Sequence, residues 1–366
     1  MMIDIPSHIA NLKSYNPGKS VEDYRAEFGF TKTAILWNNE NNLGVSKKAQ
    51  KHVNEAIKRV NTYPDPLSTE LRQKLAKLNN VNMENVVVGN GSEAILDNIL
   101  KAFCHDGEEL LTSEGTFVAV YIWALSNNVP VNKVPLTADY QIDLDEIINR
   151  ITDKTKVIYL PNANNPTGTM VSENDLKSFF EKIPDHILVV VDEAYFEYSK
   201  DLRSDYPDTS GWQKENLLTL RTFSKAYGLA GVRLGYAIGQ SRIIDALDKV
   251  RNTFEPSDLT QAAGIGALED DEFLKAGIAL NSEWLPKFKN LMNELGIKQT
   301  DSFANFIMID LESEERAVEV KDELLKRGVF VRHLPAFGLP SCLRISTGTT
   351  DENEYFLEVF REVISK

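Results

Sequence analysis

Short runs of hydrophobic residues alternate with amphipathic stretches over the middle of the chain. The stretches at 92–103 and 172–182 carry apolar side chains at helical spacing, as Ile95, Ile99 and Phe103 illustrate. Continuous apolar runs are typical of strands that are buried on both faces of a parallel sheet. We therefore expect an α/β fold with a mainly parallel sheet. The expected strands cover 86–88, 157–160, 188–191, 217–220 and 236–238.

Helices are also expected before this region. Ser46 is a residue type that caps helices, and apolar residues follow it at helical spacing as far as Val60. Pro64 and Pro66 end that helix, because proline cannot continue one. A second helix is expected at about 68–78. The N-terminal stretch before Ser46 contains Asn, Pro and Gly clusters and is expected to form loops.

The pattern changes after residue 254. Long helical stretches are expected at about 258–269 and 271–295, and Pro286 should kink the second or start a new segment. Shorter strands and helices then mix, which is typical of an α+β domain. The later elements are strands near 306–309, 329–333 and 343–347, a helix near 314–327 and a terminal helix.

Two domains are predicted from these changes. The large domain would comprise residues 46–254. The small domain would comprise residues 255–366, and the N-terminal segment 1–45 is grouped with it.

Composition and charge narrow the classes of function. The chain has 366 residues, of which 42% are hydrophobic and 26% charged, so it can bury a sizeable core. Its formal net charge of −14 disfavours binding to nucleic acid and to anionic membranes. No apolar run approaches the roughly 20 residues that cross a bilayer. We therefore expect no nucleic-acid partner and no membrane partner.

Cysteine and histidine are scarce. The two cysteines, Cys104 and Cys342, cannot form a disulfide framework, which is typical of a reducing compartment. The five histidines show no metal-ligand spacing, so no metal site is expected. The start of the chain lacks the basic and apolar segments of a signal peptide. These features predict a cytoplasmic protein.

Polar clusters directly follow four of the expected strands. Each cluster alone has a simple structural explanation, such as a tight turn, a helix cap or a surface lysine. In an open α/β sheet, however, ligands bind beyond the carboxyl ends of the strands, so the clusters predict one shared site. They are Gly89-Asn90-Gly91-Ser92-Glu93, Pro161-Asn162-Ala163-Asn164-Asn165-Pro166-Thr167-Gly168, Asp192-Glu193-Ala194-Tyr195 and Arg221-Thr222-Phe223-Ser224-Lys225.

Together these groups suit one ligand. The first N–H groups of the helix at Ser92 and Glu93, two hydroxyls and Arg233 suit a phosphate. Asp192 suits a cationic ring nitrogen, and Lys225 suits an aldehyde. These are the features of pyridoxal 5′-phosphate, so we predict that cofactor.

The chain resembles the fold-type I aminotransferases, and within them the histidinol-phosphate aminotransferase family. Similar segments extend from Tyr15-Asn16-Pro17-Gly18-Lys19 to Leu343-Arg344-Ile345, which is nearly the whole chain. The resemblance implies a homodimer that transfers an amino group from a small-molecule donor to a 2-oxo acid. The most specific segments are Tyr63-Pro64-Asp65-Pro66, Gly89-Asn90-Gly91-Ser92-Glu93, Asn164-Asn165-Pro166-Thr167-Gly168, Asp192-Glu193-Ala194-Tyr195 and Leu220 to Tyr236.

The resemblance also implies a role for each matching residue. Lys225 would bind the cofactor covalently and move a proton, and Asp192 would pair with the pyridine nitrogen. Arg344, with Arg332 near it, would hold a substrate anion, and Tyr63 would reach the phosphate of the neighbouring subunit. The remaining positions are Tyr195 and Asn165 for the ring oxygen, Phe117 for ring stacking, Ser92, Glu93, Thr222, Ser224 and Arg233 for the phosphate, and Asn41 and Leu43 for the substrate.

Three segments depart from the family pattern. Asn42 replaces a proline and Leu43 lacks a phenol in a segment that would cover the substrate. Gly115 stands where proline is usual, before the stacking aromatic. Glu255 lies in a loop where the family carries asparagine; we expect a solvated loop carboxylate, although one near a substrate would favour a cation. None of these changes touches the cofactor residues.

The leading hypothesis is transamination from histidinol phosphate to 2-oxoglutarate, giving imidazole-acetol phosphate and glutamate for histidine biosynthesis. The alternatives within the family are an aromatic or other amino-acid aminotransferase and a threonine-phosphate decarboxylase-like enzyme. A non-catalytic cofactor-binding protein is disfavoured, because every catalytic position has the required residue type. A nicotinamide-dependent dehydrogenase is disfavoured, because Ser92-Glu93-Ala94 after Gly91 does not complete a G-x-G-x-x-G turn.

Overall fold

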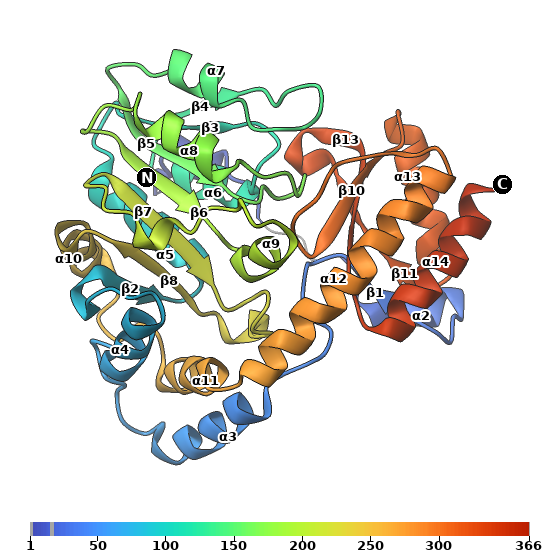
Figure 1. Ribbon diagram of the computed structural model, residues 1–366, viewed down its shortest axis with the longest axis horizontal. Helices are drawn as coiled ribbons and strands as arrows, with labels where there is room; N and C mark the ends of the chain where they lie inside the picture. Colours follow the sequence, from blue (N-terminus) through green and yellow to red (C-terminus); the bar gives the residue numbers. More distant parts are fainter. Residues whose placement is uncertain (1–2, 15–17, 366) are drawn as a thin grey trace.

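The computed structural model describes residues 3–14 and 18–365. Tyr15-Asn16-Pro17, the start of the first family-like segment, lies outside the described residues. The chain forms a larger part around a seven-stranded sheet and a smaller part around a four-stranded sheet, and the two parts lie side by side (Figure 1). Both parts contribute to the site described below.

The seven-stranded sheet confirms the expected α/β fold. Its strand order is β2-β8-β7-β6-β5-β3-β4, and the five strands from β7 to β4 are parallel. β8 runs antiparallel to both of its neighbours, so the sheet is mainly rather than wholly parallel. The strands are β2 (Val86–Gly89), β3 (Glu109–Ser113), β4 (Val131–Val134), β5 (Thr155–Pro161), β6 (Leu188–Asp192), β7 (Leu217–Thr222) and β8 (Gly235–Gly239).

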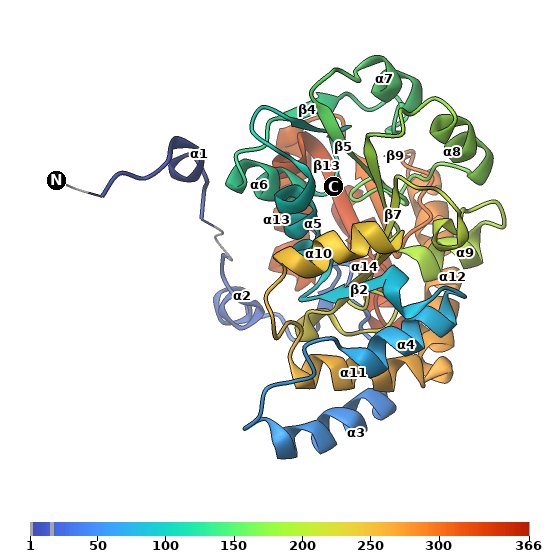
Figure 2. The same cartoon turned by 90° about the vertical axis from the view of Figure 1, so that its left-hand side faces the viewer.

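Helices cover both faces of this sheet, which is why its strands are apolar at consecutive positions. Val190 packs with α5, α6 and α10, whereas Val189 and Val191 pack on the opposite side with α7 and α8. Figure 2 shows α4, α11 and α3 layered at the β2 end. These helices are α3 (Lys47–Ala56), α4 (Thr69–Leu78), α5 (Ser92–Phe103), α6 (Val118–Ser126), α7 (Leu144–Asn149), α8 (Glu173–Phe180), α10 (Ser241–Val250) and α11 (Asp258–Leu268). A further helix, α9 (Phe196–Leu202), follows β6.

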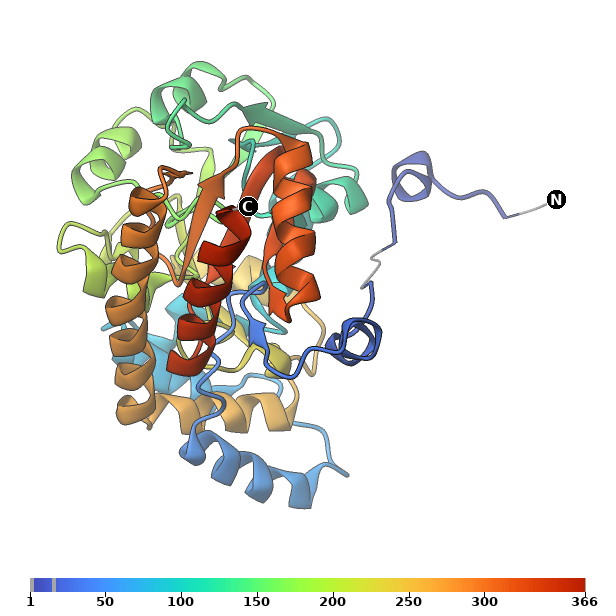
Figure 3. The ribbon, with the colours of Figure 1, turned by 90° about the vertical axis from the view of Figure 1, so that its right-hand side faces the viewer.

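The smaller part is an antiparallel sheet of order β12-β13-β10-β9. Figure 3 shows α12, α14 and α13 side by side against this sheet. Pro286 lies inside α12, which continues through it, so of the two expected effects the start of a new segment is excluded and the kink stays a prediction. The elements are α12 (Asp271–Glu294), β9 (Lys298–Gln299), β10 (Phe306–Asp310), α13 (Glu314–Lys326), β11 (Val329–Phe330), β12 (Arg332–Leu334), β13 (Leu339–Ser346) and α14 (Thr350–Ile364).

The N-terminal segment joins the smaller part through β1 (Ala34–Ile35). Ala34 pairs in parallel with Val329 of β11, and the chain then crosses to α3 of the larger part. The boundary at residue 254 stays a prediction, and α11, which follows it, packs against α3 and α4.

The N-terminal segment is less loop-like than expected. α1 (Ser7–Ala10) and α2 (Val21–Phe28) are helical, and Ser20 with Asp23 forms a capping box at the start of α2. Among the described residues, none of the helices has the length and apolar character needed to cross a membrane.

Candidate active site

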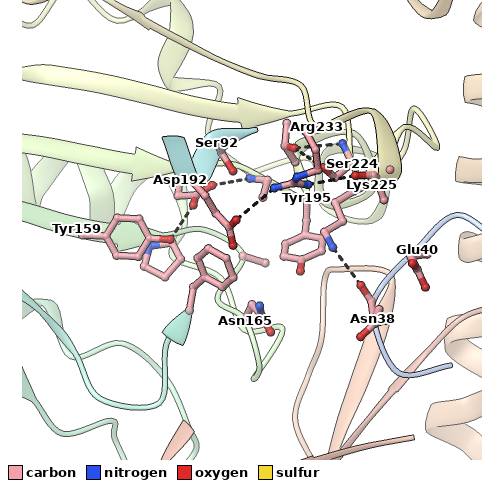
Figure 4. A pocket seen from close by; sticks show the side chains of 18 residues that line it. Asn38, Glu40, Ser92, Tyr159, Asn165, Asp192, Tyr195, Ser224, Lys225 and Arg233 are labelled. Carbon is pink, nitrogen blue, oxygen red and sulfur yellow. Dashed lines mark hydrogen bonds and ion pairs between the residues drawn. The ribbon is translucent and has the colours of Figure 1, made fainter. Parts of the chain in front are cut away.

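A cavity of about 650 Å³ opens at the carboxyl ends of the central strands (Figure 4). The loops after β2, β5, β6 and β7 all contribute to its wall, as the four polar clusters predict. The segment between β1 and α3 supplies another side. The lining residues are Asn38, Glu40, Ser92, Glu93, Phe117, Tyr159, Pro161, Ala163, Asn165, Asp192, Ala194, Tyr195, Thr222, Ser224, Lys225, Ala230, Gly231 and Arg233.

Asp192 ends β6 and is only 4% exposed. Its Oδ2 accepts a hydrogen bond from the Tyr159 hydroxyl at 2.6 Å, and its Oδ1 accepts one from the Ala194 N–H at 3.1 Å. Burial raises the pKa of Asp192 to about 6, although both hydrogen bonds favour the ionised form. A cation placed against this carboxylate would therefore gain a buried ion pair. Sequence reasoning missed Tyr159, because it lies in an apolar run that looks like core.

Lys225 follows β7 and extends into the cavity (Figure 4). Its Nζ donates a hydrogen bond to the Asn38 carbonyl oxygen at 3.2 Å. Burial and, to a smaller extent, the charge of Arg344 lower the pKa of Lys225 to about 8, whereas Glu40 opposes the shift. The amine is therefore a better nucleophile near neutral pH than an ordinary lysine is.

In the ligand-free protein, we expect Lys225 to react with an acylating reagent with a midpoint near pH 8. Only the neutral amine reacts, so the rate should fall as the pH drops below this midpoint. At pH 7 the neutral fraction would be roughly 300-fold larger than for a lysine at the ordinary value of 10.5. Peptide mass spectrometry over a pH series measures the midpoint, with surface lysines as internal reference. A midpoint near 10.5 would contradict the expectation.

A phosphate-sized cradle lies at the start of α5. Gly91 adopts φ +82° ahead of Ser92, and no side chain caps this helix. A Cβ at Gly91 would lie 2.7 Å from Arg233 Nη2, so glycine lets the guanidinium approach the turn. Arg233 Nη2 lies 3.2 Å from Glu93 Oε2. The Thr222 hydroxyl donates to Ser224 Oγ at 3.0 Å, which places two hydroxyls beside the same helix start.

Tyr195 and Asn165 face the cavity from two other loops. The Tyr195 hydroxyl accepts a hydrogen bond from Asn39 Nδ2 at 2.8 Å, and burial raises the pKa of Tyr195 to about 12. Arg344 Nη1 donates to Asn165 Oδ1 at 2.5 Å, so the amide of Asn165 has a fixed orientation. Phe117, at the N-terminus of α6, lines the same cavity.

Arg344 is a buried cation beside the cavity. Its Nη2 donates to the Trp37 carbonyl at 2.7 Å, and its Nε has no hydrogen-bond partner among the described residues. Burial lowers the pKa of Arg344 to about 10, and neighbouring Arg332 adds to this. Arg332 lies opposite Arg344 in the β12–β13 register, and its side chain forms no hydrogen bond or ion pair with the residues that the structure describes. The pair could hold an anion.

Two expected substrate residues lie outside the lining of the main cavity. The Asn41 side chain donates to the Ala226 carbonyl at 2.9 Å, and Leu43 is 41% exposed. The same segment instead contributes Asn38 and Glu40 to the cavity. The sequence pattern gave no signal for this choice, because it depends on tertiary hydrogen bonds.

Tyr63 is 78% exposed and lies outside the lining of the cavity. Its ring stacks on Phe254, with ring centroids 4.2 Å apart. The role of Tyr63 in a neighbouring subunit therefore stays a prediction.

The departures from the family pattern have local causes. Asn42 Nδ2 donates to Glu352 at 2.8 Å and to the Ile35 carbonyl at 3.0 Å, so it joins two segments. Gly115 adopts φ +56°, which proline cannot adopt. Glu255 is only 6% exposed and accepts a hydrogen bond from the Asn90 N–H at 2.6 Å. The expectation that Glu255 is a solvated carboxylate is therefore wrong; it supports the turn before α5.

A buried ion pair lies beneath the site. Glu193 Oε2 accepts hydrogen bonds from Arg221 Nε at 2.9 Å and Nη2 at 2.7 Å, and Asp208 adds a contact at 2.7 Å. Thr209 donates to the other Glu193 oxygen through its N–H at 3.0 Å and its hydroxyl at 2.7 Å. These bonds fix the ends of β6 and β7 relative to each other.

Arg221→Met should lower the free energy of unfolding by about 3–5 kcal/mol, because Glu193 would remain buried without its cation. Urea unfolding measures the change. Arg242→Met is the control, since that arginine pairs with Glu215 at an exposed site and should matter by less than about 1 kcal/mol. A loss of less than about 1 kcal/mol in the free energy of unfolding for Arg221→Met would contradict the expectation that Arg221 compensates the buried charge of Glu193.

Comparison with known proteins identifies the family. Residues 34–360 match the family model described as aminotransferase class I and II. The chain belongs to this family. This aminotransferase is 37% identical to the histidinol-phosphate aminotransferase of Bacillus subtilis (strain 168), over 98% of this chain and 99% of the relative. It is 36% identical to the enzyme of the same name from Geobacillus sp. (strain WCH70), over 100% and 99% of the two chains.

Solved structures confirm the fold-type I architecture of the aminotransferase. Histidinol-phosphate aminotransferase from Sinorhizobium meliloti, in complex with pyridoxal-5′-phosphate, superimposes with a TM-score of 0.89. The two are 27% identical, and the match covers 100% of this chain and 98% of the other. A Thermus thermophilus aspartate aminotransferase mutant has a TM-score of 0.83 at 22% identity, over 99% and 100% of the chains, and shares the fold.

Proposed function

We propose that this chain is a pyridoxal-phosphate-dependent aminotransferase that takes histidinol phosphate as amino donor and 2-oxoglutarate as acceptor. The observation that carries the proposal is the convergence of Lys225, Asp192 and Arg233 on one cavity. The names of the relatives support the choice of donor. In this role the protein would act in histidine biosynthesis, and its two-cysteine composition suits a cytoplasmic location.

The donor set fits pyridoxal 5′-phosphate. The cradle at the start of α5, with Thr222, Ser224 and Arg233, would hold the phosphate. Asp192 would hold the ring nitrogen, and Lys225 would hold the aldehyde carbon. Tyr195 and Asn165 would donate to the ring oxygen, and Phe117 would cover the ring.

The bound cofactor would supply an electron sink for the substrate Cα. Asp192 would keep a proton on the ring nitrogen, because its buried carboxylate needs a cationic partner. Lys225 Nζ would act as the general base that takes the Cα proton of the amino donor, and its lowered pKa suits this role. Arg344 and Arg332 would hold an anionic group of the donor or the acceptor.

A panel of amino donors tests this proposal. The cofactor-loaded protein is mixed separately with histidinol phosphate, glutamate, phenylalanine and threonine phosphate, and the cofactor absorbance is followed. Conversion to the amine form of the cofactor with histidinol phosphate and glutamate is expected. A response to phenylalanine without histidinol phosphate would favour an aromatic aminotransferase, and carbon dioxide release from threonine phosphate would favour the decarboxylase alternative.

We also propose a homodimer in which Tyr63 reaches the phosphate of the neighbouring subunit. The exposed, stacked Tyr63–Phe254 pair supports this, because large apolar side chains are seldom left in water without a partner. Sedimentation velocity should give twice the chain mass, and Tyr63→Phe should weaken cofactor binding. A monomer with full cofactor affinity would contradict both statements.

A further inference from the structure

The segment that contains Glu40 is fixed at one edge of the active-site cavity. The Asn39 N–H donates to Ser346 Oγ at 2.9 Å, and the Ser346 hydroxyl donates back to Asn39 Oδ1 at 2.8 Å. Asn41 is tied to the Ala226 carbonyl on the other side of Glu40. Because both neighbours are held, the Glu40 backbone has a defined position. Figure 4 shows Glu40 at the Asn38 and Lys225 side of the cavity, away from Tyr159 and Asp192.

Glu40 is the one acidic side chain of the described cavity lining that has no hydrogen bond or ion pair with described residues. The other two acids of the lining are occupied. Asp192 accepts from Tyr159 and Ala194, and Glu93 pairs with Arg233. Glu40 is half-buried, so its carboxylate loses part of its hydration without a protein partner in exchange. A ligand group could supply that partner.

There is room for a ligand beside Glu40. A second cavity of about 570 Å³ shares Glu40, Ala230 and Gly231 with the main one. The other acid of this second cavity, Glu352, already accepts from Asn42 at 2.8 Å and from the Ile35 N–H at 3.1 Å. Glu40 therefore presents the free carboxylate where the two spaces meet.

The charges of the site are separated. Arg233 lies at the phosphate cradle and Arg344 beside Asn165, so anionic groups of the cofactor and the substrate have partners there. Glu40 would repel another carboxylate or phosphate and attract a cation or a strong N–H donor. A side group with a ring N–H that can be protonated fits this position.

We propose that Glu40 is a specificity-determining residue that binds the cationic or N–H-bearing side group of the amino donor, an imidazolium in particular. This inference rests on the proposed transaminase function and deepens it. In this role the carboxylate accepts a charge-assisted hydrogen bond from the ring N–H, and donors whose ring has no N–H lack that bond.

Glu40→Gln tests the proposal with two donors that differ only in the ring, histidinol phosphate and phenylalaninol phosphate. The ratio of their kcat/KM values should fall about five- to tenfold, mainly through a higher KM for histidinol phosphate. Glu40→Asp should keep part of the preference. Glu354→Gln is the matched control, because Glu354 is exposed on α14 and lines neither cavity.

The pH dependence gives a second readout. Free imidazole groups titrate near pH 6.5, so the wild-type preference for the imidazole donor should grow as the pH falls through that range. The phosphate titrates in both donors and cancels in the ratio. In Glu40→Gln the ratio of the two kcat/KM values should depend less on pH.

Other outcomes would overturn the proposal. An unchanged ratio would mean that Glu40 does not contact the ring, and an equal fall of kcat for both donors would mean that it acts only through Lys225. If the wild type uses neither phosphate ester, the proposed donor is wrong. Histidine and phenylalanine then form the matched pair, and a ratio unaffected by Glu40→Gln would still reject the role of Glu40.

Discussion

Lys225→Ala is expected to lower kcat for transamination by at least about 10⁴-fold. The substitution removes both the amine that would hold the cofactor and the base that would move the Cα proton. The loss should appear in kcat, because the phosphate cradle, Asp192 and the arginines remain in place. Stopped-flow absorbance of the half-reaction with histidinol phosphate measures the rate.

Two further measurements make this prediction specific. Borohydride treatment of the wild type should leave the cofactor on the peptide that contains Lys225, and the variant should carry none. Lys200→Ala is the control, because Lys200 donates to the Tyr206 carbonyl at 3.0 Å outside the cavity lining. Turnover by Lys225→Ala within tenfold of the wild type would refute the assignment of the catalytic residue.

Asp192→Asn is expected to reduce kcat by about 10³-fold. The amide can still accept from the Tyr159 hydroxyl, so the fold should persist. It carries no negative charge, however, and would no longer keep the cofactor ring nitrogen protonated. The negative charge that develops on the substrate Cα would therefore be less stabilised. Single-turnover kinetics with and without a deuterated Cα would show whether proton removal has become slower.

Asp310→Asn is the matched control for this variant. Asp310 also accepts from a tyrosine, with Tyr140 Oη at 2.6 Å, but it lies at the end of β10 outside the cavity lining. Asp310→Asn should change kcat by less than about threefold, since the Asp310 carboxylate does not face the active-site cavity. Comparable losses for both variants would show that the effect of Asp192→Asn comes from the phenol–carboxylate pair and not from the active-site charge.

The sequence predicts both the sheet and the centre of the site well. Both predictions rest on the same signal, the short apolar runs that mark buried strands. Buried strands require apolar residues on both faces, so Val189, Val190 and Val191 identify a strand by themselves. Polar groups that follow such strands must meet at one edge. The convergence of Asp192 and Lys225 therefore follows from local pattern and parallel topology alone.

Features set by distant contacts were not predictable in the same way. The antiparallel direction of β8 depends on how the chain returns after β7, and a short apolar run does not encode it. Whether Glu40 or Asn41 faces the cavity depends on the Ala226 carbonyl, which is distant in sequence. Glu255 is buried because the turn at Asn90 needs an acceptor. Each of these three features depends on a contact with a residue distant in sequence, which the local pattern does not predict.

The pairing of β1 with β11 determines the order in which the protein can be completed during synthesis. Ala34 pairs with Val329, about 295 residues later in the chain, and Ser346 holds Asn39. The strands and helices that carry Asp192 and Lys225 can form on the ribosome before either partner has been made. The edge that presents Glu40 can be completed only after Val329 and Ser346 have been made. A nascent chain would thus gain its reactive groups first and its means of discriminating between donors last.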